Sequence, residues 1–210
     1  MQNDRKETVQ VHEGTDNVGR IALLGLILVI TLLLASVRVV FGQAPSNESR
    51  GAIRPFVGAY IPTGEQRDFL KDAVLVGAQG TWNTTEMVAL TGSFGWAPSK
   101  DKVTAGDLTL DAFQYDLGVE VHPSSAILAG TTPFVGLGAG GRTYSYRDYS
   151  VDSKTNFDGY AALGLDALAG PVGLRLEARD YVSKFQPLAG GGESKTRNDL
   201  AIFAGVGIRF

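Results

Sequence analysis

The chain has 210 residues, a formal net charge of −3, no cysteine and two histidines. This length favours one domain with room for a sizeable core. The lack of cysteine excludes disulfides and thiolate metal sites, and the lack of a long basic run argues against a nucleic-acid partner.

The N-terminal segment differs in character from the rest of the chain. Residues 1–20 are polar and of mixed charge, and Ile21–Ser36 is a run of sixteen residues without a charge. Small residues follow up to Ala44, which is typical of a secretory signal and its cleavage site. We therefore expect residues 1–44 to be a signal peptide, with an uncleaved membrane anchor as the alternative, and residues 45–51 to be a short linker.

From Ala52 onward, apolar residues alternate with small or polar ones, a period that predicts β-strands. Eight such segments follow one another in the chain. They are Ala52–Ile61, Ala73–Trp82, Glu86–Trp96, Leu110–Val121, Thr132–Tyr146, Phe157–Leu168, Val172–Val182 and Leu200–Phe210. The pattern predicts an all-β domain over residues 52–210.

Strand length and loop length favour a membrane barrel over a soluble sandwich. About 9–11 tilted residues span the apolar core of a bilayer, whereas strands of soluble proteins average about 5–6. The connections at residues 62–72, 97–107, 147–156 and 183–198 are long, and those at 83–85 and 169–171 are short, with an intermediate one at 122–131. Long outer loops and short periplasmic turns predict an eight-stranded antiparallel up-and-down transmembrane β-barrel.

Along each strand, every second residue has the same parity and faces the same side of the sheet. The residues on the parity opposite to the apolar one carry balanced charge. Five positive residues (Arg54, Arg142, Arg175, Arg179 and Arg209) accompany five negative ones (Asp116, Glu120, Asp158, Asp166 and Glu177). Buried charges need partners, and an eight-stranded barrel is only wide enough for its side chains to fill. We therefore expect a structural salt-bridge network that plugs the lumen.

Glycines and aromatic residues fit the same arrangement. Inward glycines such as Gly138 and Gly207 leave room for large side chains from neighbouring strands. Aromatic residues near strand ends are expected to form girdles at the membrane interfaces; these are Trp82, Trp96, Tyr144, Tyr146 and Tyr181.

The stretches PFVGLGAGGRTYSY, VGLRLEARDYV and GVGIRF resemble small bacterial outer-membrane β-barrel proteins, the group of the OmpA-type barrel domain and its opacity-like relatives. The resemblance covers residues 52–210. In that family the C-terminal aromatic residue and the alternating apolar residues before it are recognised by the barrel-assembly machinery. The resemblance implies this role for Val206, Ile208 and Phe210, and a place in the bacterial outer membrane after export.

Catalytic and metal sites are not expected. His12 lies in the expected signal, and His122 lies at the periplasmic end of a strand, on the wrong side for chemistry on outer-leaflet lipid A. The acidic loop Arg147–Asp158 lacks the spacing of a calcium loop. We expect no catalytic residue, cofactor or metal.

The sequence thus predicts a non-enzymatic, structural or surface-exposed outer-membrane barrel with four extracellular loops. We expect a monomer in contact with outer-membrane lipid and lipopolysaccharide. The alternatives are a small porin of narrow conductance, a lipid A-modifying enzyme, or, if the apolar segment is retained, a periplasmic β domain anchored in the inner membrane.

Overall fold

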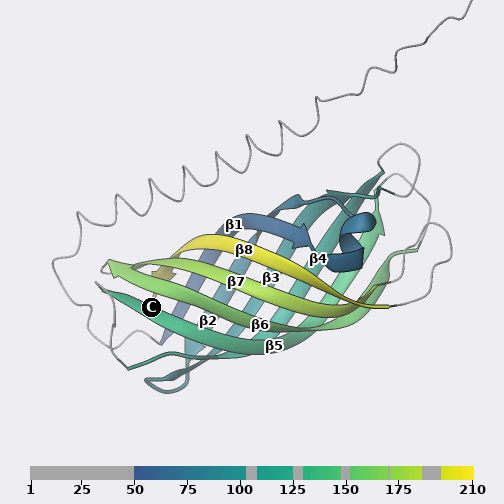
Figure 1. Cartoon of the computed structure of the whole chain (residues 1–210). Helices are drawn as coiled ribbons and strands as arrows, with labels where there is room; N and C mark the ends of the chain where they lie inside the picture. The colour runs from purple at the N-terminus through teal and green to yellow at the C-terminus, as the bar shows by residue number, and fades with distance from the viewer. Residues whose placement is uncertain (1–49, 103–107, 125–129, 148–151, 170, 186–194) are drawn as a thin grey trace, which may run out of the picture. The chain divides into compact units, whose positions relative to one another are not determined.

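The computed structural model describes residues 50–102, 108–124, 130–147, 152–169, 171–185 and 195–210. The expected signal peptide and nearly all of the expected linker lie outside these ranges. Within these ranges, eight strands and one short 3₁₀ helix make up the fold (Figure 1). Their bounds are β1 Gly51–Pro62, η1 Gly64–Asp68, β2 Ala73–Asn83, β3 Val88–Lys100, β4 Thr109–Val121, β5 Thr131–Tyr146, β6 Lys154–Ala169, β7 Val172–Phe185 and β8 Lys195–Arg209.

The strands form one closed antiparallel barrel in sequence order, with β8 paired to β1. This confirms the predicted eight-stranded up-and-down architecture. The seam closes at the last residue, because the backbones of Gly51 and Phe210 exchange two hydrogen bonds of 2.9 Å each. A closed seam leaves no strand edge with unpaired backbone groups, which a lipid environment requires. Among the described residues, no helix is long and apolar enough to cross a membrane.

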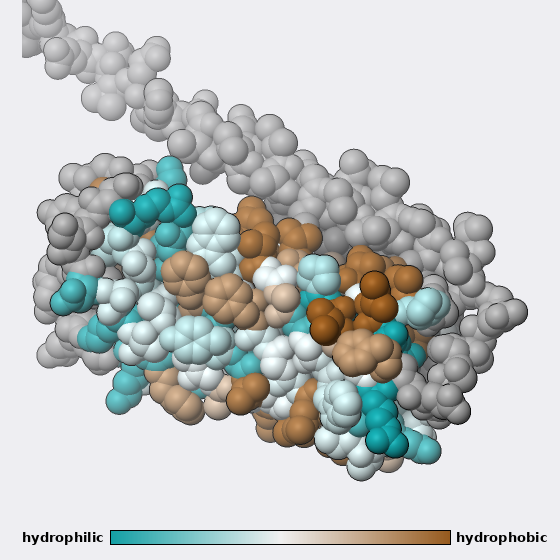
Figure 2. Space-filling model, turned by 180° about the vertical axis from the view of Figure 1, so that it is seen from behind, coloured by the Kyte–Doolittle hydropathy of each residue, from teal (hydrophilic) through white to brown (hydrophobic). Residues whose placement is uncertain are grey.

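Side chains divide by parity between the lumen and the outer surface. On β7, Arg175, Glu177 and Arg179 are buried inside the barrel, while the residues between them face outward. Many large apolar side chains on the outside are exposed; Leu117 and Leu137 are 75% and 70% exposed. In Figure 2, apolar residues cover much of the middle of the barrel and hydrophilic residues gather towards its two ends. This inside-out arrangement suits a barrel surrounded by lipid.

We call the end of the barrel with the long connections its outer end and the opposite end its periplasmic end, after the predicted orientation. At the outer end the strands extend further than the alternation predicts. β3 runs to Lys100, β6 begins at Lys154, β7 runs to Phe185 and β8 begins at Lys195. In these extensions both parities are largely polar, so the apolar alternation used for the prediction is absent although the backbone ladder continues.

The expected aromatic girdle is partly wrong. Trp82 is half exposed on the outside, but Tyr144, Tyr146 and Tyr181 are buried in the lumen. Their parity explains the outcome, because Tyr144 and Tyr146 are two and four residues from the inward Arg142.

Glycines make room for large inward side chains from neighbouring strands, as the sequence predicted. A Cβ on Gly138 would lie 2.3 Å from the Tyr160 ring, and one on Gly207 would lie 2.1 Å from Cγ of Arg54. Real side chains do not approach so closely, so both positions exclude any larger residue unless the neighbouring strand shifts.

Candidate functional site: the charged lumen

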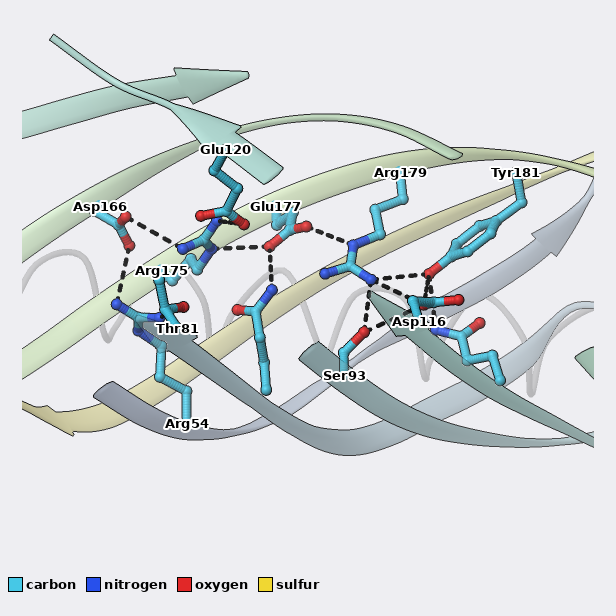
Figure 3. Close-up of polar contacts among 12 residues, drawn as sticks. Arg54, Thr81, Ser93, Asp116, Glu120, Asp166, Arg175, Glu177, Arg179 and Tyr181 are labelled. Atoms are coloured by element: carbon cyan, nitrogen blue, oxygen red, sulfur yellow. Dashed lines mark hydrogen bonds and ion pairs between the residues drawn. The ribbon is translucent and has the colours of Figure 1, made fainter. Parts of the chain in front are cut away.

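The periplasmic half of the lumen is organised around Arg175 on β7. Its guanidinium contacts Glu120 of β4 at 2.5 Å, Glu177 at 2.8 Å and Asp166 of β6 at 3.4 Å. Asp166 in turn lies 3.9 Å from Arg54 of β1. Figure 3 shows this chain of contacts crossing the interior from one wall to the other. Four strands are therefore linked by charge at this level.

Glu177 joins the periplasmic half to the middle of the lumen. One carboxylate oxygen accepts from Arg175 and the other from Arg179, at 2.8 and 2.5 Å, and Gln79 donates a further bond at 3.1 Å. Arg179 also contacts Asp116 of β4 at 3.0 Å (Figure 3). Because carboxylate and guanidinium alternate along this line, each buried charge has an opposite charge beside it.

Aromatic faces cover the guanidinium groups that the carboxylates leave open. Arg175 lies 3.6 Å from the centre of the Phe134 ring, and Arg179 lies 4.4 Å from that of Tyr160. Such cation–π contacts add favourable energy where the cation is desolvated. They also occupy the cross-section that a pore would need.

A second cluster lies in the outer half of the lumen. Arg142 of β5 is bonded to Asp199 of β8, and its Nε lies 3.7 Å from Asp158 of β6. The Cζ atom of its guanidinium lies 4.4 Å from the centre of the Tyr181 ring and 5.4 Å from the centre of the Tyr60 ring. This cluster is a second barrier, above the one centred on Arg175 and Arg179.

The first outer loop closes the barrel over this cluster. Gln66 of η1 is fully buried and its amide donates at 3.2 Å to Tyr60, Tyr144 and Asp199. Leu70, just after η1, is 1% exposed and belongs to the apolar core at the outer mouth. The loop therefore acts as a lid anchored from inside the lumen.

Nine of the ten residues expected in the network take part in the contacts described above; they are Arg54, Asp116, Glu120, Arg142, Asp158, Asp166, Arg175, Glu177 and Arg179. The exception is Arg209. It is half-buried at the end of β8, and within the described ranges its side chain pairs with no carboxylate. It lies opposite Ala52 at the periplasmic rim, where β1 offers no acidic partner.

Two important partners escaped the sequence analysis. Asp199 falls between the predicted loop at 183–198 and the predicted strand Leu200–Phe210, and Gln66 falls in the predicted loop at 62–72. The available signal for Asp199 was its parity, since it is two residues from the inward Ala201. Gln66 carried no such signal, because a loop has no period.

The arrangement offers little chemistry beyond fixed charge. Ser93 lies 3.2 Å from Asp116, but its hydroxyl also accepts from Arg179, and no histidine adjoins it among the described contacts. The His122 ring contacts the neighbouring Pro123 carbonyl, and the backbone N–H of His122 donates to the Met87 carbonyl. No group of acidic residues and histidines suited to a metal ion occurs among the described residues.

Comparison with solved structures places the barrel among known folds. Neisserial surface protein A matches with a TM-score of 0.57 at 11% identity, over 76% of this chain and 96% of that one. OprG, an outer membrane protein of Pseudomonas aeruginosa, matches with a TM-score of 0.54 at 14% identity, over 79% and 98%.

The fold is that of the small eight-stranded outer-membrane β-barrels. The structural likeness exists without detectable sequence similarity, since no family model and no curated protein matches the chain. An outer-membrane barrel constrains its sequence mainly by parity, so unrelated residues can build the same walls. The resemblance that the sequence suggested is confirmed at the level of this fold.

Proposed function

We propose that the chain is a structural or surface-exposed protein of the bacterial outer membrane, without enzymatic activity. The observation that carries the proposal is the continuous line of buried ion pairs from Asp166 through Arg175 and Glu177 to Arg179 and Asp116. A lumen filled in this way serves as a rigid plug, and it leaves the outer loops as the surface for contacts with other molecules.

Single-channel recording in planar bilayers tests the plugged lumen. The purified barrel should give no steady conductance above that of the lipid alone. Steady openings would favour the alternative of a small porin with narrow conductance. Comparing the mass spectra of lipid A from cells that lack or overproduce the protein tests the absence of enzymatic activity. The two spectra should agree, and a new modified species would indicate a lipid A-modifying enzyme.

The proposal includes export and assembly. Residues 1–44 serve as the signal, and Val206, Ile208 and Phe210 serve as the recognition strand for the barrel-assembly machinery. The outward parity of these three residues is compatible with that role. N-terminal sequencing of the mature protein should find a start near Pro45, whereas a retained N-terminus would favour the anchored alternative.

The remaining partners follow from the outer surface. The monomeric barrel contacts outer-membrane lipid and lipopolysaccharide through its apolar belt. Sedimentation in density-matched detergent should give the mass of one chain.

A further inference from the structure

The outer surface of β6, β7 and β8 carries a groove near its extracellular end. It has a volume of about 440 Å³, and Asn156 and Ser183, which have the opposite parity, form part of its lining. The outward-facing residues of the lining are Thr155 and Phe157 of β6, Val182 and Lys184 of β7, and Thr196 of β8. These residues combine one cation, two hydroxyls and two apolar side chains. A purely lipid-facing surface would offer apolar groups alone.

Asp180 lies on the same face of β7, below the groove. It is exposed on the outside of the barrel, opposite Ala161 of β6 and Leu200 of β8. Its neighbours on the outward parity are the apolar Ala178 and Val182, so the carboxylate interrupts the apolar belt. Charged groups that face lipid are costly and mark functional positions.

The protein satisfies this carboxylate only in part. Among the described residues, its contact is a long hydrogen bond of 3.5 Å from the Asn198 amide. An ionised carboxylate has about four lone-pair sites and only accepts hydrogen bonds. The Asp180 carboxylate can therefore accept further hydrogen bonds from a molecule outside the barrel.

The spacing of charges along β7 defines what the ligand must contain. Lys184 and Asp180 share a parity and are four residues apart, which is about 13 Å along a strand. Lys184 is the cation of the groove lining. The outer end of this face thus attracts an anion, and the level below it attracts a hydrogen-bond donor.

We propose that this face binds one phosphorylated glycolipid of the outer leaflet. Its phosphate lies at Lys184, its acyl chains run past Phe157 and Val182, and a hydroxyl or amide N–H at the head of a chain donates to Asp180. A glycerophospholipid supplies the phosphate but has only ester carbonyls at that depth, which accept and cannot donate. The proposal rests on the outer-membrane location proposed above.

The test compares two anionic lipids on the full chain in dodecyl maltoside micelles. Hexa-acylated, bis-phosphorylated lipid A carries the phosphate and also donors at the head of its acyl chains. Dioleoyl phosphatidylglycerol carries the phosphate, but its hydroxyl donors lie only in the head group beyond the phosphate. Native mass spectrometry measures how much of each lipid stays bound. The wild type should retain one lipid A at least tenfold better than phosphatidylglycerol.

Three variants separate the contributions. Lys184→Gln should weaken binding of lipid A about fivefold, the effect of one basic residue at an anionic lipid surface. Asp180→Leu should remove the preference for lipid A while leaving phosphatidylglycerol binding unchanged. The control Lys100→Gln removes an exposed lysine from the outer end of β3, away from the groove, and should change neither.

An unchanged preference in Asp180→Leu, or an equal loss in Lys100→Gln, would overturn the proposal. Asp180→Asn retains the size of the side chain and should reduce the preference as well, which covers the case in which the leucine variant does not fold. Conductance is measured separately on the wild type. An open pore would contradict the plugged lumen and leave this lipid site standing, so the two proposals fail independently.

Discussion

Replacement of Glu177 by alanine tests whether the lumen network holds the barrel together. The carboxylate makes two ion pairs with Arg175 and Arg179 and accepts a bond from Gln79. Breaking a buried pair by removing one partner costs about 3–5 kcal/mol. Arg175 keeps Glu120 and Asp166, and Arg179 keeps Asp116, so we expect the low end, about 3 kcal/mol.

The assay is equilibrium urea unfolding of the barrel in thin dilauroyl phosphatidylcholine vesicles, followed by tryptophan fluorescence. If the slope of the unfolding free energy against urea concentration is the same for the wild type and the variant, the two proteins unfold between the same folded and unfolded states. The matched control is Asp72→Ala, which breaks a 3.4 Å ion pair with Arg67 in which both side chains are more than half exposed. Exposed pairs contribute about 0–1 kcal/mol.

Salt adds a second criterion. Exposed pairs are screened at high ionic strength and buried ones much less, so the cost of Glu177→Ala should persist in about 1 M salt. If the two variants differ by less than about 1 kcal/mol, the network contributes no more than a surface pair and the reasoning is refuted.

Three further substitutions probe the wall, the packing and the lid. Leu176→Arg puts a charge on the lipid face of β7 and should lower the free energy of unfolding in vesicles by about 2–4 kcal/mol if the site is near the midplane; tolerance equal to that of an inward site would contradict the assigned faces. Gly138→Ala, whose Cβ would lie 2.3 Å from a tyrosine ring, should destabilise by about 1–3 kcal/mol in the same titration. Gly80→Ala, which meets no atom within 4 Å, is its control and should be near neutral. Gln66→Ala removes three buried hydrogen bonds and should speed tryptic cleavage of residues 63–72 in the folded protein at least about tenfold; an unchanged rate would mean that the lid is held by other contacts.

Parity made most of the lumen predictable. Arg175, Glu177 and Arg179 are two residues apart, so one assignment of the apolar face to lipid places all three inside. The same rule places Tyr144 beside Arg142, and the girdle prediction was wrong because proximity to a strand end was weighed above parity. The period of a strand is therefore the stronger guide.

Pairing across the lumen was not predictable. Arg142 meets Asp199, which is 57 residues away, and Asp158, on the neighbouring strand. Such contacts depend on strand register and on how far each side chain reaches across the interior, and neither leaves a local pattern. Asp199 was further hidden because the outer end of β8 is polar on both parities.

The lid and the ion pairs together make the two ends of the lumen unequal. At the outer end, Gln66 and Asp199 are fully buried, whereas near the periplasmic end the Asp166 side chain is 22% exposed. An ion entering from the periplasm would meet the Arg175 level first, and then the Arg142 cluster under the lid. Because these barriers lie in series, loosening the lid alone leaves the ion pairs closed, and removing Glu177 alone leaves the lid closed. Conductance should therefore require both changes in one chain, and a single substitution that opens the barrel would show that one barrier alone keeps it closed.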